Sequence, residues 1–214
     1  MENRAARLQR IDVMTWITTV PYDAAKGRLK TFYDRIKGPN NNIDNIMMAH
    51  SLRPHTMEGH MTLYKHVLHN PANKTPRWLL EALGVYVSIM NGCDYCSVHH
   101  FQGMRHLLAD DDRAEAIRSA LEAEDLGRAF DDEATVAMFR YARHLTTEPK
   151  SVSAKDIDAM RDAGVSDGVI LEINQVVSYF SYANRTVVGL GINTDGDLIG
   201  LAPSGESSDD WSHQ

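Results

Sequence analysis

The sequence has 214 residues, of which 43% are hydrophobic and 24% charged, a composition typical of a folded globular domain rather than a disordered chain. A chain of this length can bury a core without disulfide or metal cross-links. Its net charge of -7 argues against binding to nucleic acid or to an anionic membrane surface, because both partners select basic patches.

No apolar run is long enough to span a bilayer, and the opening residues MENRAARLQRIDVMTW lack the continuous apolar stretch of a signal peptide. We therefore expect a cytoplasmic protein that does not enter membranes. In that compartment, two cysteines close together in sequence are more often catalytic or metal-binding than a permanent disulfide.

Apolar residues recur at helical spacing along nearly the whole chain, and no segment shows the alternation of a strand. Thr75 and Pro76 are the expected start of one central helix, and Asn91-Gly92 its end. Ser153 and Ser166 are expected caps of two later helices. In chain order, the predicted helices cover residues 23–38, 40–52, 54–70, 76–90, 93–111, 111–123, 132–146, 153–164 and 166–191.

These elements predict an all-α protein with one helical domain over residues 1–192. Residues 193–214 are rich in Gly, Asp and Ser, and we expect them to form a weakly ordered C-terminal tail. No internal repeat or change of composition suggests a second domain.

The decapeptide NGCDYCSVHH contains both cysteines of the chain, Cys93 and Cys96. Their spacing puts them at the start of a predicted helix, where unpaired backbone N–H groups stabilise a thiolate. Residues three apart lie on one helix face, so the two sulfurs are close enough to form a disulfide. His100 follows Cys96 by one helical turn and can exchange a proton with it.

Glu81 lies in the preceding helix, beside the apolar stripe that includes Leu80 and Leu83. A carboxylate in such a position needs a partner, because an unpaired buried charge is costly. If the two helices fold back about Asn91-Gly92, Glu81 and His100 lie at similar distances from the turn. The hairpin would then allow them to meet.

Together these residues make the pattern E-x11-C-x2-C-x3-H, which resembles the signature of the alkylhydroperoxidase D-like family of the carboxymuconolactone decarboxylase superfamily. The stretch INQVVSYFSYANRTVVGLGI also resembles the closing helix of the peroxidase-related branch of that family. The resemblance covers roughly residues 20–192, whereas the motif itself is confined to residues 81–100.

The resemblance implies an alkylhydroperoxidase D-like helical fold that assembles as a trimer or hexamer and needs no haem, flavin or metal. It implies reduction of hydroperoxides, with Cys96 attacking the peroxide and Cys93 closing the disulfide. Glu81 and His100 would relay protons, and an external dithiol or thiol protein would restore the thiols.

Two features of the motif depart from this scheme. The position at the helix start favours Cys93 as the more acidic thiol, whereas the family pattern and the nearby His100 favour Cys96 as the attacking one. In addition, Tyr95 stands where better-known members carry a histidine, and Asp94 adds a negative charge that raises the pKa of nearby thiols.

Other interpretations of the same residues remain open. The cysteines could be inert core thiols, or could bind zinc with His99 or His100. The fourth zinc ligand would be one of Glu81, His50, His55, His60 and His66. Glu81 could instead be a salt-bridged surface residue. His99 is expected to be structural or exposed, and the histidines of 50–69 to lie at the surface or an interface. Asn184 and Arg185 are expected to line either the site or a subunit interface, and the interface is preferred. A redox sensor, a binding protein and a decarboxylase are the alternative functions.

Overall fold

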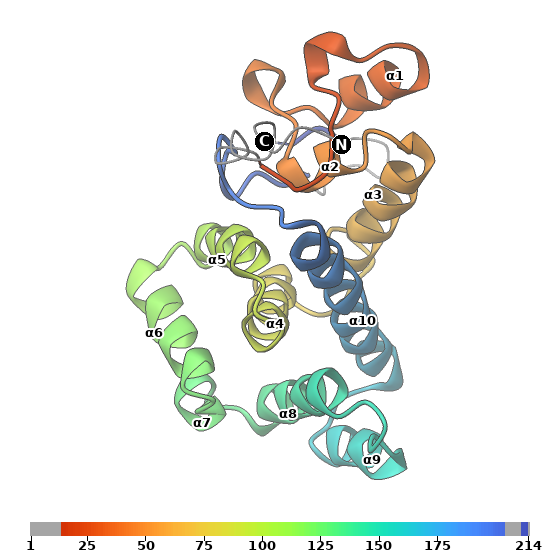
Figure 1. The fold of residues 1–214 in the computed structure, drawn as a ribbon. Helices are drawn as coiled ribbons and strands as arrows, with labels where there is room; N and C mark the ends of the chain where they lie inside the picture. The colour runs from red at the N-terminus through yellow and green to blue at the C-terminus, as the bar shows by residue number, and fades with distance from the viewer. Residues whose placement is uncertain (1–13, 204–210, 214) are drawn as a thin grey trace, which may run out of the picture.

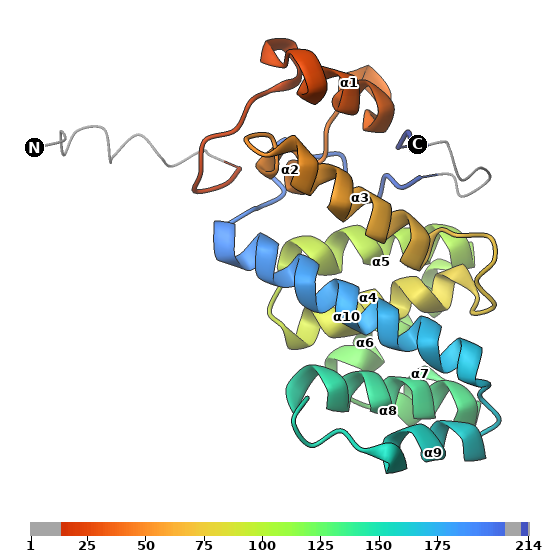
Figure 2. The same cartoon turned by 90° about the vertical axis from the view of Figure 1, so that its right-hand side faces the viewer.

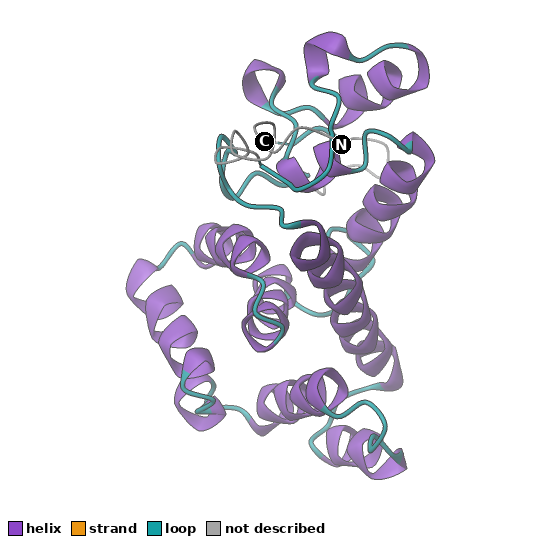
Figure 3. Cartoon of the chain, in the orientation of Figure 1, coloured by secondary structure: helices purple, strands orange, loops and turns teal. Residues whose placement is uncertain are grey.

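The computed structural model describes residues 14–203 and 211–213. Within these residues the chain forms ten α-helices and two single 3-10 turns and contains no β-strand (Figure 3). The all-α architecture predicted from the sequence is therefore confirmed. In chain order, the elements are the turn Tyr22–Ala24, α1 (Gly27–Ile36), the turn Pro39–Asn41, α2 (Asn45–Ala49), α3 (Pro54–Leu68), α4 (Arg77–Met90), α5 (Asp94–Leu108), α6 (Asp111–Glu122), α7 (Leu126–Ala129), α8 (Glu133–Thr147), α9 (Ala154–Asp162) and α10 (Asp167–Leu190).

Helix α4 lies in the middle of the bundle, with α5, α8 and α10 packed against it (Figures 1 and 2). Every residue from Leu79 to Ser88 is buried, because the segment is apolar on nearly all sides. Glu81 is buried as well, although it is the only charged residue in that run. The core of the protein is therefore built around a helix that carries one carboxylate.

A tight turn joins α4 to α5 and makes them an antiparallel hairpin. Gly92 adopts a φ of +64°, in the left-handed region that glycine enters without strain. The N–H of Cys93 then donates to the carbonyl of Ser88 at 2.9 Å, which closes the end of α4. Cys93 becomes the residue that precedes the first turn of α5, as the sequence predicted.

Polar caps fix where several other helices begin. The side chains of Asp110 and Ser166 accept backbone N–H bonds at the starts of α6 and α10, and Ser153 forms a capping box at the start of α9. The expected cap at Thr75 was wrong. Its N–H and hydroxyl both donate to the carboxylate of Glu172 on α10, so α4 begins only after Pro76.

The described residues of the expected tail, 193–203 and 211–213, fold back onto the bundle. The side chain of Asn45 on α2 donates to the carbonyls of Asn193 and Asp195 at 2.9 and 3.1 Å. Trp211 packs edge-on against Phe32 of α1 with ring centroids 5.9 Å apart. These residues form one wall of the site described below. Residues 1–13 of the predicted domain, and 204–210 and 214 of the predicted tail, lie outside the described residues.

The ring of Phe180 on α10 lies directly against Gly84 of α4, and this contact generates a testable prediction. A Cβ atom placed on Gly84 would lie 2.1 Å from the ring of Phe180. Gly84→Ala should therefore lower the free energy of unfolding by about 1–3 kcal/mol or more, because a packed core cannot absorb an extra methyl group. Chemical denaturation measures the change.

Gly59→Ala provides the matched control, because Gly59 lies on the exposed side of α3 with no atom within 4 Å of the added Cβ. That change should leave stability unchanged or raise it slightly, since alanine is the better helix former. Equal effects of the two substitutions would contradict the close packing of α4 and α10.

Candidate active site

The hairpin brings Glu81 of α4 and His100 of α5 into direct contact, although they are 19 residues apart. The Nδ1–H group of His100 donates to Oε2 of Glu81 at 2.6 Å, and their side chains are only 14% and 4% exposed. Glu81 is therefore not a surface residue, which removes that alternative. Two of the four residues of the motif meet inside the bundle, across the turn at Gly92.

The surroundings of Glu81 keep it charged. Burial alone would raise the pKa of Glu81, but the charge and hydrogen bond of His100, together with His69 and Arg77, outweigh burial and lower it. His69 Nε2 lies 4.0 Å from Oε1, and Arg77 donates to the other ring nitrogen of His69 at 3.1 Å. Gly103 leaves room for the carboxylate, because a Cβ there would lie 3.1 Å from it.

The two cysteines lie next to each other at the start of α5 as free, buried thiols. A hydrogen bond links their sulfurs, and the side-chain amide of Asn184 on α10 donates toward both. Asn184 is itself held by Ser88 at 3.0 Å and Asn91 at 2.9 Å. Of the two positions expected for Asn184, the structure places it in the site, buried against the thiols, and the preferred subunit interface was wrong.

The pKa values of the two thiols are shifted in opposite directions. The hydrogen bond from Cys96 lowers the pKa of Cys93, whereas burial raises the pKa of Cys96 well above its usual value. The prediction that the thiol at the helix start is the more acidic agrees with these directions. Position, however, favours Cys96 as the attacking sulfur. Cys96 lines the same cavity as Glu81 and His100, whereas Cys93 lines a groove on the outer side.

The cavity beside Cys96 has a volume of about 50 Å³. One buried water needs roughly 10–15 Å³ of such space, so the cavity has room for a molecule of a few heavy atoms. Its walls combine apolar groups with several polar rings. The lining includes Ile46, Met47, Met61 and Ala183, and the rings of His60, Tyr64, Tyr95, His99, His100, Tyr179 and His213.

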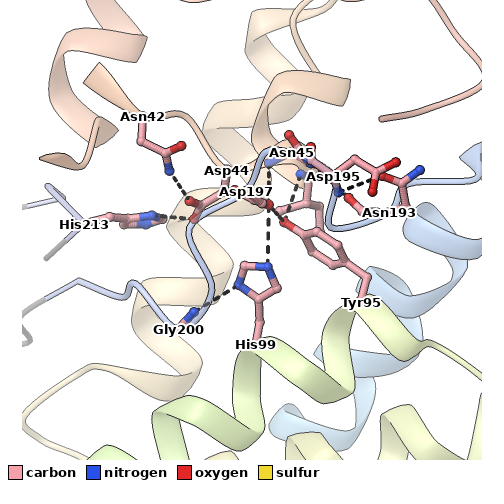
Figure 4. A network of polar contacts seen from close by, with 11 residues as sticks. Asn42, Asp44, Asn45, Tyr95, His99, Asn193, Asp195, Asp197, Gly200 and His213 are labelled. Atoms are coloured by element: carbon pink, nitrogen blue, oxygen red, sulfur yellow. Dashed lines mark hydrogen bonds and ion pairs between the residues drawn. The ribbon is translucent and has the colours of Figure 1, made fainter. Parts of the chain in front are cut away.

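The folded-back tail supplies Gly200, Leu201, Ala202 and His213 to the cavity wall. A buried carboxylate, that of Asp197, fastens the tail to the bundle (Figure 4). Its Oδ2 accepts the hydroxyl of Tyr95 at 2.7 Å and the N–H of Asn45 at 3.0 Å, and lies 3.5 Å from His99 Nε2. Burial would raise the pKa of Asp197, but these contacts, with His99 first, lower it. Tyr95, which directly precedes Cys96, therefore anchors the tail to the start of α5.

A second carboxylate and imidazole pair lines the same cavity. Nδ1–H of His213 donates to Oδ2 of Asp44 at 2.6 Å, with side chains 5% and 9% exposed. Sequence reasoning missed His213 and Asp197, because the composition of residues 193–214 indicated a tail, and it missed Asp44 because the partner of Asp44 lies in that segment. The apolar side chains of Leu201 and Trp211 within that segment were the available signal that it packs.

Several alternative interpretations can now be compared with the structure. His60 and His69 are 4% and 1% exposed, so the expectation of surface positions was wrong for them. His99 is 11% exposed at its side chain and lies in the cavity wall. Among residues 14–203 and 211–213, no group of three or more His, Cys, Asp and Glu side chains is arranged to hold a metal ion. In the same part of the chain, no helix combines the length and apolar character needed to cross a membrane.

Comparison with known proteins identifies the fold. No protein-family model and no curated protein matches the sequence. A solved structure of the alkylhydroperoxidase AhpD core, from a peroxidase-related protein of Ralstonia eutropha JMP134, matches with a TM-score of 0.70 at 17% identity, over 85% of this chain and 92% of that one. A peroxidase-related protein from Silicibacter sp. TM1040 matches with a TM-score of 0.65 at 19% identity, over 86% and 89%.

The debrominase Bmp8 has the same fold, with a TM-score of 0.63 at 16% identity over 87% of this chain and 92% of its own. A cysteine-to-alanine variant of that protein was solved in complex with 2,3,4-tribromopyrrole. The resemblance drawn from Glu81, Cys93, Cys96 and His100 is thus confirmed as an alkylhydroperoxidase D-like fold. At these sequence identities the comparisons establish the fold only, and the activity has to be argued from the residues of the site.

The lowered pKa of Glu81 predicts how the site responds to acid. In the native state the pKa of this carboxylate is below its usual value of 4.5. Its pair with His100 therefore contributes its full stability above pH 4.5. The contribution is lost as the pH falls through the lowered native pKa. Glu81→Gln should cost about 1–3 kcal/mol of unfolding free energy at neutral pH, since it weakens a buried charged hydrogen bond.

The difference between wild type and Glu81→Gln should shrink as the pH falls below 4.5, because the glutamine cannot titrate. Urea denaturation at a series of pH values measures both. Glu58→Gln is a suitable control, because that carboxylate lies in an exposed ion pair with Arg28. A difference at Glu81 that stayed constant with pH would contradict an ionised Glu81 in the native protein.

Proposed function

We propose that the protein is a thiol-dependent peroxidase that reduces hydroperoxides through Cys96 and Cys93. The observation that carries the proposal is that Cys96 shares one small, largely closed cavity with the buried pair Glu81 and His100. A nucleophile, a base and a group that orients the base are the parts that thiol activation requires. The second thiol needed to complete a redox cycle is hydrogen-bonded to the first.

The first step is removal of a proton from Cys96. Burial raises the pKa of this thiol, so it is protonated at rest and needs a base. Glu81 occupies Nδ1 of His100, which leaves Nε2 to take the proton. The carboxylate also stabilises the imidazolium that results, as in other carboxylate and histidine pairs. In this scheme the Cys96 thiolate forms only when Glu81 and His100 remove its proton, so the resting thiol is protected from unwanted oxidation.

The thiolate then attacks one peroxide oxygen, and the O–O bond breaks with its electron pair going to the other oxygen. The sulfur is oxidised by two electrons to a sulfenic acid, and the leaving oxygen becomes an alcohol or water once it gains a proton. Cys93, whose pKa is lowered, attacks the sulfenic sulfur of Cys96 and releases water. The products are one alcohol, one water and the Cys93–Cys96 disulfide.

An external dithiol or thiol protein would reduce that disulfide from the outer side. Cys93 lines a surface groove between the start of α5 and the end of α10, whose other residues include Asp94, Val98, Val187 and Ile192. Attack there makes Cys96 the leaving thiolate and returns it to the cavity. The proposed setting is the cytoplasm, where such reductants keep most thiols reduced.

We also propose that the chain forms a trimer or hexamer. Large apolar side chains of α10 remain exposed in the single chain, with Leu171 at 60%, Val188 at 48% and Tyr182 at 41%. Monomers seldom leave such side chains in contiguous patches. Light scattering coupled to size-exclusion chromatography distinguishes these assemblies from a monomer.

Removal of bromine from an aromatic ring is a second candidate. The specific observation in its favour is that the debrominase fits this chain about as well as the peroxidase-related proteins do, with TM-scores of 0.63–0.64. A dithiol could supply the two electrons that replace a carbon–bromine bond by carbon–hydrogen. The volume of about 50 Å³ argues against a ring with three bromines unless the cavity widens. Bromide release from 2,3,4-tribromopyrrole, measured beside peroxide consumption, separates the two.

Serine substitutions test the roles of the cysteines. Cys96→Ser should abolish dithiol-dependent consumption of hydrogen peroxide and form no sulfenic acid, because the attacking sulfur is gone. Cys93→Ser should also stop turnover but allow one oxidation, leaving Cys96 as a sulfenic acid that a dimedone probe labels. Peroxide electrodes and mass spectrometry of the labelled peptide measure both.

Ser97→Ala provides a control at a buried neighbour on the same helix. Full turnover by either cysteine variant would exclude the proposed cycle. Sulfenic acid on Cys93 in Cys96→Ser would reverse the assignment of the two thiols. A disulfide that forms and is reduced, without sustained turnover in wild type, would indicate a redox sensor instead.

A further inference from the structure

We propose that His213, held by Asp44, is a second acid–base residue of this site and donates the proton that the leaving oxygen of the peroxide needs. The inference rests on the proposed peroxide reduction and adds a residue to it. Neither His213 nor Asp44 belongs to the E-x11-C-x2-C-x3-H motif, and both come from parts of the chain remote from it in sequence.

The geometry of the pair is that of an oriented imidazole. Nδ1 of His213 donates to Oδ2 of Asp44 at 2.6 Å, and Oδ1 of Asp44 accepts from the side chain of Asn42 at 3.2 Å. Nε2 of His213 is buried and has no hydrogen-bond partner among the described residues. A buried, unpaired ring nitrogen in a cavity wall is costly unless a ligand or water completes it.

The position of the pair complements that of Cys96. His99 rises from α5, whereas Asp44 and His213 lie above it, at the edge formed by the segment before α2 and the folded-back tail (Figure 4). Cys96 and His100 line the same cavity from α5. Tyr64 packs edge-on against both imidazoles, with ring centroids 6.4 Å from His213 and 6.2 Å from His100. A peroxide in the cavity would therefore have one imidazole on the side of the sulfur and another on a second wall.

Attack of sulfur on a peroxide requires a proton donor on the side away from the sulfur. A sulfur attacks a peroxide along the O–O axis, so the leaving oxygen points away from the sulfur and from a base in contact with it. An alkoxide is a poor leaving group, because its conjugate acid is about as weak as water, with a pKa near 15.7. A proton donor placed at the far oxygen removes that cost in the transition state.

The protons balance over the cycle. His100 gains the proton of Cys96, the imidazolium of His213 gives its Nε2 proton to the leaving oxygen, and Cys93 contributes its own proton to the water released on disulfide formation. At the end His100 holds one extra proton and His213 lacks one. Transfer between them through cavity water restores both. Asp44 is a positioning residue, since it binds Nδ1, stabilises the imidazolium and leaves Nε2 as the nitrogen without a partner.

The test compares leaving groups in the full-length chain. tert-Butyl hydroperoxide leaves as an alkoxide and needs the proton, whereas peracetic acid leaves as acetate and does not. His213→Gln should slow oxidation of Cys96 by tert-butyl hydroperoxide by about 100-fold, within the range for loss of a general acid, and by peracetic acid by less than about threefold. Asp44→Asn should show the same selectivity with a smaller loss. Imidazole in the buffer should partly restore His213→Ala with the alkyl hydroperoxide.

His55→Gln, at an exposed position outside the cavity, is the matched control and should react like wild type with both oxidants. Circular dichroism and thermal denaturation check that each variant is folded. An equal loss with both oxidants would show that His213 only fastens the tail, and no loss would show that it has no role; either result overturns the inference while the peroxidase stands. A wild-type protein that consumes neither oxidant would overturn the proposed function and this inference with it.

Discussion

The carboxylate of Glu81 is the constraint around which this fold is arranged. It lies in the most buried helix of the bundle, where an unpaired charge would cost several kcal/mol. His100 satisfies it directly, Arg77 and His69 support it from behind, and Gly103 leaves it space. The contacts with His100 and Gly103 require α4 and α5 to fold back at Gly92. The same turn places Cys93 and Cys96 at the start of α5, so the carboxylate that the core must accommodate also orients His100, which lines the same cavity as Cys96.

Three carboxylate or amide groups hold the rest of the cavity in place. Asp197 ties the tail to Tyr95, Asp44 holds His213, and Asn184 binds the thiols from α10. The site is thus assembled from segments distant in sequence around one short helix start. The same fold occurs in proteins described as peroxidase-related and in a debrominase. The activity of this chain must therefore be argued from its site and not from its fold.

The sequence was sufficient for the parts of the structure that depend on local pattern. Helical spacing, the Gly92 turn and the acidic and serine caps predicted the bundle, and the cost of burying Glu81 predicted its contact with His100. Thr75 failed as a cap because Glu172, distant in sequence, accepts its hydrogen bonds. His213, Asp44 and Asp197 were missed for the same reason, since composition reports the average tendency of a segment and not the few long-range contacts that hold it. Asn184 was misplaced because an apolar helix does not reveal which of its faces meets the thiols.

The central claim is that peroxide oxidises the pair Cys93 and Cys96 inside this cavity. Intact-protein and peptide mass spectrometry of the reduced wild-type chain, after one equivalent of hydrogen peroxide without reductant, tests it most directly. The account predicts a loss of two hydrogen atoms per chain and a single cross-linked peptide that joins Cys93 to Cys96, formed rapidly and reversed by a dithiol. Unmodified thiols, or oxygen added at methionines while both cysteines stay reduced, would contradict it.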